Sequence, residues 1–145
     1  PVIAAPGGMS IGGGFEVVLH ADHVVSHADS VMGLVESFVG VVPAGGGCKE
    51  TLYRWSDHLA DNQKAAWKSF MNIGLGKLAN SPSEASALAM SRQGDVFHMN
   101  RDYMLNLSLS SLEKVKKSID REPMALSGAD QFQEMVGWLD LQTTR

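Results

Sequence analysis

The stretch Gly12-Gly13-Gly14-Phe15-Glu16-Val17-Val18-Leu19-His20-Ala21-Asp22 decides the fold of this chain. Before it comes a short apolar run, residues 2–5, which the turn Pro6-Gly7-Gly8 ends and which suits a buried strand. A buried helix over 15–21 is expected to begin at the glycines, and a second strand is expected over 22–26. The glycine cluster marks a place where the backbone turns sharply or approaches a ligand closely.

A carboxylate in the first turn of this helix predicts chemistry. The first N–H groups of a helix have no partner within it and point outward, which makes an anion site. Glu16 lies there, and Glu36 follows twenty residues later. A helix of about 13 Å and a returning strand of about 20 Å would bring Glu36 to the same end. Two carboxylates beside an oxyanion donor suit proton transfer next to a carbonyl group. From the residues alone, the alternative stays open that Glu16 only complements the helix dipole and Glu36 lies on the surface.

The composition is that of one globular domain. The chain has 145 residues, 44% hydrophobic and 19% charged, and a formal net charge of −4, which excludes disorder. The acidic balance argues against a nucleic-acid partner, and the short basic run 114–117 is expected to be a solvated helix face. The single cysteine, Cys48, excludes an internal disulfide and indicates a reducing, cytoplasmic location. No apolar run approaches about 18 residues, so we expect no membrane span.

The remainder of the chain is predicted to be mainly helical. Residues 29–36 are strand or turn, and helices are expected over 48–55 and 62–75. Ser81-Pro82-Ser83-Glu84 predicts a capped helix start. Asn100 is expected to cap a long helix, and residues 127–130 to begin a last one. Their apolar sides would carry Leu105, Leu109, Leu112 and Ile119, and Phe132, Met135, Val136 and Leu139. A strand-rich region followed by helices predicts an α/β fold.

Four weaker motifs each have an ordinary structural explanation. His20, His23 and His27 suggest a metal site, but a strand over 23–26 directs His20 and His27 apart. Cys48 as a nucleophile would need a partnered base that the sequence does not supply, and a packing role is commoner. The run 45–49 lacks the spacing of a phosphate-binding loop and is expected to be a glycine-rich entry to a helix.

The fourth motif, Gly8-Met9-Ser10-Ile11-Gly12, matches the nucleophile elbow of serine hydrolases. The predicted context of strand before and helix after is the right one. A hydrolase would also need an acid and a late histidine, and only His98 follows position 58. Ser10 is therefore kept as an alternative nucleophile.

These residues resemble the enoyl-CoA hydratase/isomerase (crotonase) family. The matching features are the first strand, Gly12-Gly13-Gly14-Phe15-Glu16, the helix ending at Ala21-Asp22, Gly33-Leu34-Val35-Glu36, and the turn 42–47. The match is dense over 1–55 and looser over 60–120. Val35 stands where the family usually has proline before the second glutamate. The segment 48–80 also departs from the family, in a way that is similar to the hydratase part of bifunctional 3-hydroxyacyl-CoA dehydrogenases.

The resemblance implies a crotonase-like (ββα spiral) partial domain over 1–145, with an active-site half (1–55) and a helical region (56–145). It implies syn hydration of a trans-2-enoyl-CoA in fatty-acid β-oxidation, with Glu16 and Glu36 as catalytic residues and Gly12 and Gly13 at the oxyanion and substrate site. Both family glutamates are present, which favours a hydratase over the sister isomerases.

Further expectations follow from the same resemblance. The partners would be an acyl-CoA substrate and further copies of the chain, as a homo-oligomer. No cofactor is expected in this segment, and NAD would belong to dehydrogenase domains elsewhere in a longer protein. The chain does not begin with methionine and is about half the length of a crotonase domain, so we expect it to be the C-terminal half and inactive alone. The non-enzymatic alternative is a catalytically silent scaffold half whose helices from Asn62 onward make oligomer contacts.

Overall fold

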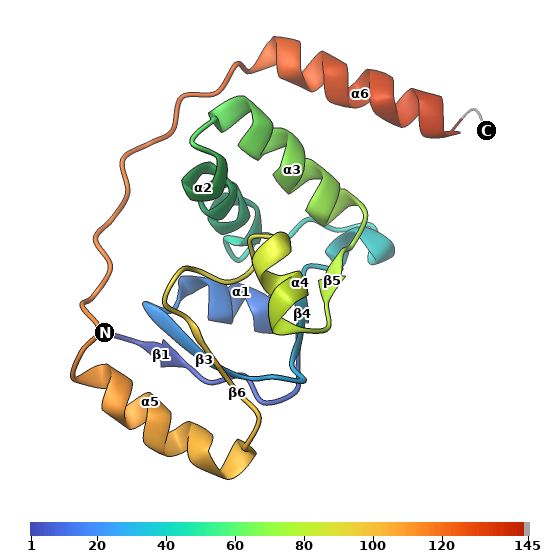
Figure 1. The fold of residues 1–145 in the computed structure, drawn as a ribbon. Coiled ribbons are helices and arrows are strands. Elements are labelled where there is room, and N and C mark those ends of the chain that lie inside the picture. The colour runs from blue at the N-terminus through green and yellow to red at the C-terminus, as the bar shows by residue number, and fades with distance from the viewer. Residues whose placement is uncertain (144–145) are drawn as a thin grey trace.

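The computed structural model describes residues 1–143 and contains two small three-stranded sheets flanked by helices (Figure 1). The first sheet has the order β1-β3-β6 and is wholly parallel. The second has the order β2-β4-β5, with β2 and β4 parallel and β5 antiparallel to β4. The strands are β1 (Ile3–Ala4), β2 (Met9–Ile11), β3 (His23–His27), β4 (Val31–Gly33), β5 (Leu78–Ala79) and β6 (Val96–His98).

Six α-helices and two 3-10 turns complete the described part of the chain. The helices are α1 (Gly13–His20), α2 (Gly47–Leu59), α3 (Asn62–Gly74), α4 (Pro82–Ala87), α5 (Met104–Leu112) and α6 (Ala129–Thr143). The 3-10 turns are η1 (Glu36–Val39) and η2 (Arg101–Tyr103). The first strands and helices agree with the expectations for residues 2–5, 15–21 and 22–26, and the mixed α/β class is confirmed.

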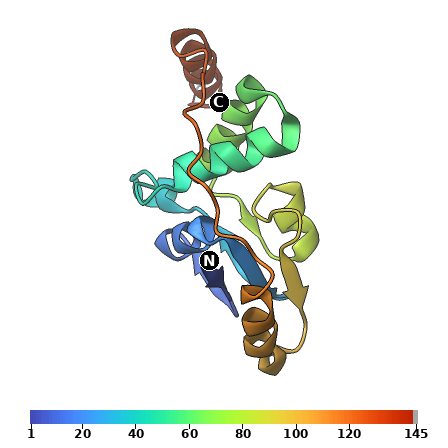
Figure 2. The ribbon, with the colours of Figure 1, turned by 90° about the vertical axis from the view of Figure 1, so that its left-hand side faces the viewer.

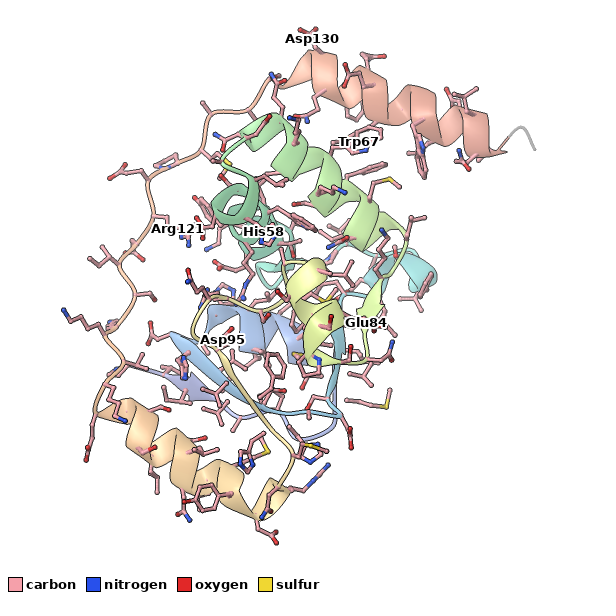
Figure 3. The ribbon with its side chains drawn as sticks, viewed as in Figure 1. His58, Trp67, Glu84, Asp95, Arg121 and Asp130 are labelled. Carbon is pink, nitrogen blue, oxygen red and sulfur yellow. The ribbon has the colours of Figure 1, made fainter. Side chains whose placement is uncertain are left out.

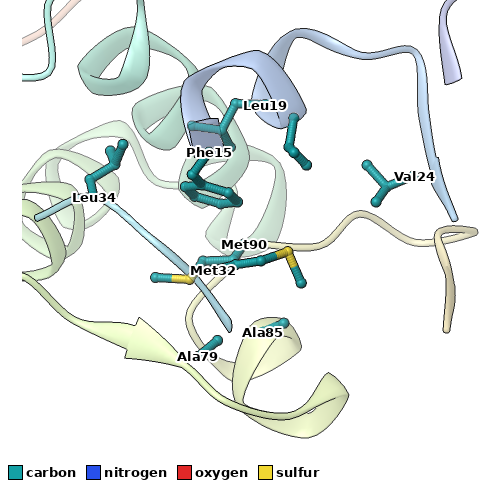
Figure 4. Packing of buried hydrophobic residues seen from close by; sticks show 9 residues of the cluster. Phe15, Leu19, Val24, Met32, Leu34, Ala79, Ala85 and Met90 are labelled. Atoms are coloured by element: carbon teal, nitrogen blue, oxygen red, sulfur yellow. The ribbon is translucent and has the colours of Figure 1, made fainter. Parts of the chain in front are cut away.

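The main core lies between α1 and the second sheet. Phe15 and Leu19 of α1 pack with Met32 of β4, and Ala85 and Met90 close the other side (Figure 4). Phe15 and Leu19 are each only 1% exposed, because the spacing of four residues puts them on one face of the helix. This packing fixes the orientation of α1 and hence of Glu16, which lies between them in the sequence.

Two arginines cap the carboxyl end of α1. Arg54 donates to the Leu19 and Met90 carbonyls at 3.1 and 3.2 Å, and Arg92 donates to the Leu19 and Ala21 carbonyls at 3.1 and 2.6 Å. Cations at this end complement the helix dipole. Burial, together with the positive charge of Arg92, lowers the pKa of Arg54 to about 10.

The prediction of a long helix after Asn100 is wrong in the length of that helix. Asn100 does accept a hydrogen bond from the Asp102 amide at 3.0 Å, but the helix α5 ends at Leu112. Residues 116–127 have no regular secondary structure, and Ile119 is 88% exposed. The basic run 114–117 therefore follows the helix instead of forming its solvated face. Ser118 holds this segment by donating two hydrogen bonds to Asp22.

The last helix begins where it was predicted, but its apolar stripe does not pack as a unit. Trp138 makes edge-on contacts with Trp67 and Phe70 of α3, at ring-centroid distances of 6.3 and 6.0 Å. Trp67 lies on the side of α3 that faces α6 (Figure 3). Phe132 is 61% exposed on α6. The rings on α3 thus select the side of α6 that carries Trp138, and Phe132 is left outward.

The region 56–145, predicted to be helical, also supplies strands to both sheets. β5 pairs with β4, and β6 pairs with β3. These strands are two and three residues long, too short for a period-two pattern to predict. Within residues 1–143, α5 and α6 lie at opposite ends of the molecule (Figure 2), and none of the described helices is long and apolar enough to cross a membrane.

Candidate active site

Glu16 is a buried carboxylate at the start of α1. It is 9% exposed and is the fourth residue of the helix. Its Oε1 accepts a hydrogen bond from the Gly47 amide at 2.8 Å, while Oε2 accepts none from residues 1–143. One oxygen is therefore held by the backbone, and the other remains available for a proton.

The glycine turn 45–47 packs directly against this carboxylate. A Cβ on Gly47 would lie 2.8 Å from Glu16 Oε1, and a Cβ on Gly45 would lie against Glu16 Oε2. Glycine is required here because the backbone approaches the carboxylate closely. The sequence predicted this turn as an entry to a helix, and α2 does begin at Gly47. Its contact with Glu16 was not predicted, since nothing local indicates which residue a glycine turn will meet.

The other glycine cluster forms the amino end of α1. Gly12 has φ +56° and ψ −132°, a conformation that side chains disfavour, and its amide donates to the Gly33 carbonyl at 2.9 Å. The Gly13 and Gly14 amides donate to no acceptor in the described residues. Two unpaired N–H groups at a helix start are the arrangement from which the sequence predicted an anion site, and that site stays a prediction.

Glu36 lies against this same cluster. A Cβ on Gly12 would lie 3.4 Å from Glu36 Oε1. Glu36 Oε2 is buried and has no hydrogen-bond partner among residues 1–143. Glu36 begins the turn η1, and the preceding Val35 has φ −122°, which the ring of proline does not reach. Valine at this position therefore allows a backbone approach to Glu36 that proline could not make.

Cys48 follows directly after Gly47, whose amide binds the Glu16 carboxylate. Burial raises the pKa of the Cys48 thiol above its ordinary value, and the negative charges of Glu16 and Glu36 raise it further. The approach of Glu36 to Gly12, the N-cap of α1, agrees with the expectation that Glu36 returns to the end of the helix that bears Glu16. A raised pKa keeps the thiol protonated and argues against the alternative of a cysteine nucleophile.

The same geometry makes Cys48 a reporter of the two charges. We expect Glu16→Gln and Glu36→Gln each to lower the pKa of the thiol, because each removes a nearby negative charge. Alkylation by iodoacetamide at mildly alkaline pH should then be faster in each variant, because the thiolate is the reactive form. Glu113→Gln, at the end of α5, serves as the control with an unchanged rate. Equal rates in all the proteins would contradict the shared location of the two carboxylates.

An apolar cavity of about 400 Å³ opens beside Cys48. Its wall comes from the segment after Glu36, from α2, from α3 and from Met135 of α6. The lining includes Val41, Val42, Pro43, Leu52, Phe70 and Ile73. Such a cavity accepts an alkyl chain and offers it few polar contacts.

The weaker candidates do not gather into sites. Ser10 lies within β2 opposite Met32, so it is a strand residue and not the exposed residue of an elbow turn. His98 belongs to the other sheet. The three clustered histidines have separate partners, which are the Gly45 carbonyl for His20, Asp95 for His23 and the Met99 carbonyl for His27. Residues 1–143 contain no group of three or more His, Cys, Asp or Glu side chains that could hold a metal ion.

Comparison with known proteins adds a sequence relative. No family model matches the chain. It is 39% identical over 105 residues to a protein of Bacillus subtilis (strain 168) named a probable 3-hydroxyacyl-CoA dehydrogenase. The match covers 72% of this chain but only 13% of that protein.

Solved structures give the fold. An enoyl-CoA hydratase from Mycobacterium tuberculosis H37Rv matches 79% of this chain with a TM-score of 0.61 and 25% identity. One from Mycobacterium marinum matches 100% of it with a TM-score of 0.62 and 23% identity. The chain spans 40% and 56% of these two structures. The chain therefore has the crotonase fold and resembles part of an enoyl-CoA hydratase/isomerase domain, as the sequence predicted.

Proposed function

We propose that this chain carries the catalytic carboxylates of an enoyl-CoA hydratase. The observation that carries the proposal is the approach of Glu16 and Glu36 to the amino end of α1, beside the unpaired amide of Gly13 and near an apolar cavity that Cys48 lines. Hydration of an unsaturated thioester requires three features. These are groups that transfer protons, a hydrogen-bond donor to the carbonyl oxygen and an apolar space for the acyl chain.

In the proposed reaction, water adds across the double bond of a trans-2-enoyl-CoA. Glu16 takes a proton from water through its unpaired Oε2 while the hydroxyl oxygen bonds to C3. Glu36 gives a proton to C2 on the same face of the double bond. The addition is therefore syn, and the product is a 3-hydroxyacyl-CoA. The two glutamates act as a pair, and the proton gained by one restores the other. Charge that develops on the thioester oxygen is held by the Gly13 amide, and Gly12 leaves room for that oxygen.

The position of the cavity supports an acyl-CoA substrate. Ser37, which follows Glu36, and Cys48 both line it, so a chain that enters there leaves its reacting end beside the carboxylates. No metal or redox cofactor takes part in this proposed step. The named relative supports a link to a 3-hydroxyacyl-CoA dehydrogenase in a longer protein, where NAD would bind and the 3-hydroxyacyl product would be oxidised in β-oxidation.

A hydration assay tests the proposal. The longest native polypeptide that contains this chain is mixed with crotonyl-CoA, and loss of the ultraviolet absorbance of the enoyl thioester is followed. We expect turnover that Glu16→Gln lowers by about 10²–10⁴-fold. Absence of turnover in a folded, full-length protein would contradict the proposal.

One observation favours a second candidate, the scaffold half. Leu105 and Leu109 of α5 are 68% and 55% exposed, and they present an apolar face with spacing typical of helix contacts. A homo-oligomer would cover such a face. The scaffold alternative requires association without hydratase turnover, so light scattering together with the assay separates it from the enzyme.

A further inference from the structure

His20 and Glu16 project from the same face of α1, because they are four residues apart. The glycine turn 45–47 contacts both side chains. His20 Nε2 donates to the Gly45 carbonyl at 2.9 Å, and the Gly47 amide donates to Glu16 Oε1 at 2.8 Å. The turn is therefore tied to α1 at two points, one for each side chain.

The fit of the turn against His20 is close. Gly46 has φ +106°, and a Cβ there would collide with His20 Nε2. Since Nε2 donates to a carbonyl, Nδ1 is the nitrogen that faces Glu50, at 3.8 Å from Oε1. Glu50 is itself anchored by Lys49 at 3.1 Å and lies 3.8 Å from Arg92, which caps α1. One ring nitrogen of His20 thus faces Glu50, while the other binds the turn.

We infer that His20 is a positioning residue for Glu16. By fixing the Gly45 carbonyl, His20 fixes the direction of the Gly47 amide, and that amide fixes which carboxylate oxygen is left for the proton. The inference rests on the proposed function, because it assigns His20 a role in a reaction that Glu16 performs. It adds a residue that the sequence suggested only as a weak metal ligand.

Three substitutions at His20 test this role in the full-length protein. Glutamine can place an amide N–H near the position of Nε2, whereas alanine and leucine cannot donate. We expect His20→Ala and His20→Leu to lower kcat about 10- to 100-fold, since a small misplacement of a reacting group has effects of up to about that size. KM should change little, because His20 does not contact the acyl cavity. His20→Gln should recover most of the lost kcat.

The kcat and KM values of these variants distinguish a positioning role of His20 from a general loss of structure. Thermal unfolding of each variant is measured beside the kinetics, and His20→Leu keeps bulk at the site if His20→Ala folds poorly. A fall in kcat that glutamine does not restore, or a rise in KM equal to the fall in kcat, would overturn the inference. Glu16→Gln is assayed in parallel. If Glu16→Gln is inactive and His20→Ala keeps its kcat, the inference fails alone, and if Glu16→Gln is active the proposed function fails with it.

Discussion

Glu36→Gln lowers hydratase turnover by about 10²–10⁴-fold, the usual contribution of a positioned acid or base. Glutamine keeps the volume of the side chain but cannot give or take the proton at C2. Glu36 Oε2 is buried without a partner among the described residues, so no structural hydrogen bond to that oxygen is lost with the substitution. The expected result is therefore a folded protein with a low kcat, measured by the hydration assay and a thermal melt.

The control and the companion variant sharpen this result. Glu113→Gln changes one charge at the end of α5, away from the site, and should keep full turnover. The turnover of Glu16→Gln should be as low as that of Glu36→Gln. The turnover of the double variant should be little lower, because the effects of residues that act as a unit are not additive. Near-normal turnover of Glu36→Gln would remove the two-glutamate mechanism and favour either an isomerase with one carboxylate or the scaffold alternative.

The sequence predicted the positions of Gly12, Glu16 and Glu36 better than it predicted the outer helices. Gly12 and Glu16 could be placed because a glycine cluster followed by an apolar helix leaves few local conformations. The return of Glu36 followed from the lengths of one helix and one strand. Ile119 could not be placed, since its apolar side chain continues a helical spacing that the backbone abandons at Leu112. Local spacing contains no information on where tertiary contacts stop a helix.

The supports of the site were also beyond prediction. His20 and Gly45 are 25 residues apart and meet only because α1 and α2 pack together. The pairing of β5 with β4 is likewise long-range and involves a strand of two residues. Contacts of this kind depend on the whole fold, so sequence patterns indicate candidate catalytic groups before they indicate which residues hold those groups in place.

Gly33→Ala is the substitution that tests one of these supports most severely. An added Cβ would collide with the Lys77 carbonyl and would lie 2.8 Å from Leu78 Cδ2. The carbonyl belongs to backbone beside β5, so it cannot turn away as a flexible side chain would. We expect a loss of about 2–3 kcal/mol in the free energy of unfolding, toward the upper end for overpacking. At about 2–4 °C per kcal/mol for a domain near this size, the melting temperature should fall by roughly 5–10 °C.

The same change should reach the site, because the Gly33 carbonyl accepts the Gly12 amide at 2.9 Å and so holds the amino end of α1. Gly14→Ala is the matched control, with nothing within 4 Å of its added Cβ and a helical position that alanine favours. Circular dichroism melts of both variants decide the matter, with Gly14→Ala expected to melt no lower than the parent chain. If Gly33→Ala melts as Gly14→Ala does, β5 does not approach β4 as closely as the structure places it. In that case β5 is not what holds Gly33, and through its carbonyl the Gly12 amide, in place.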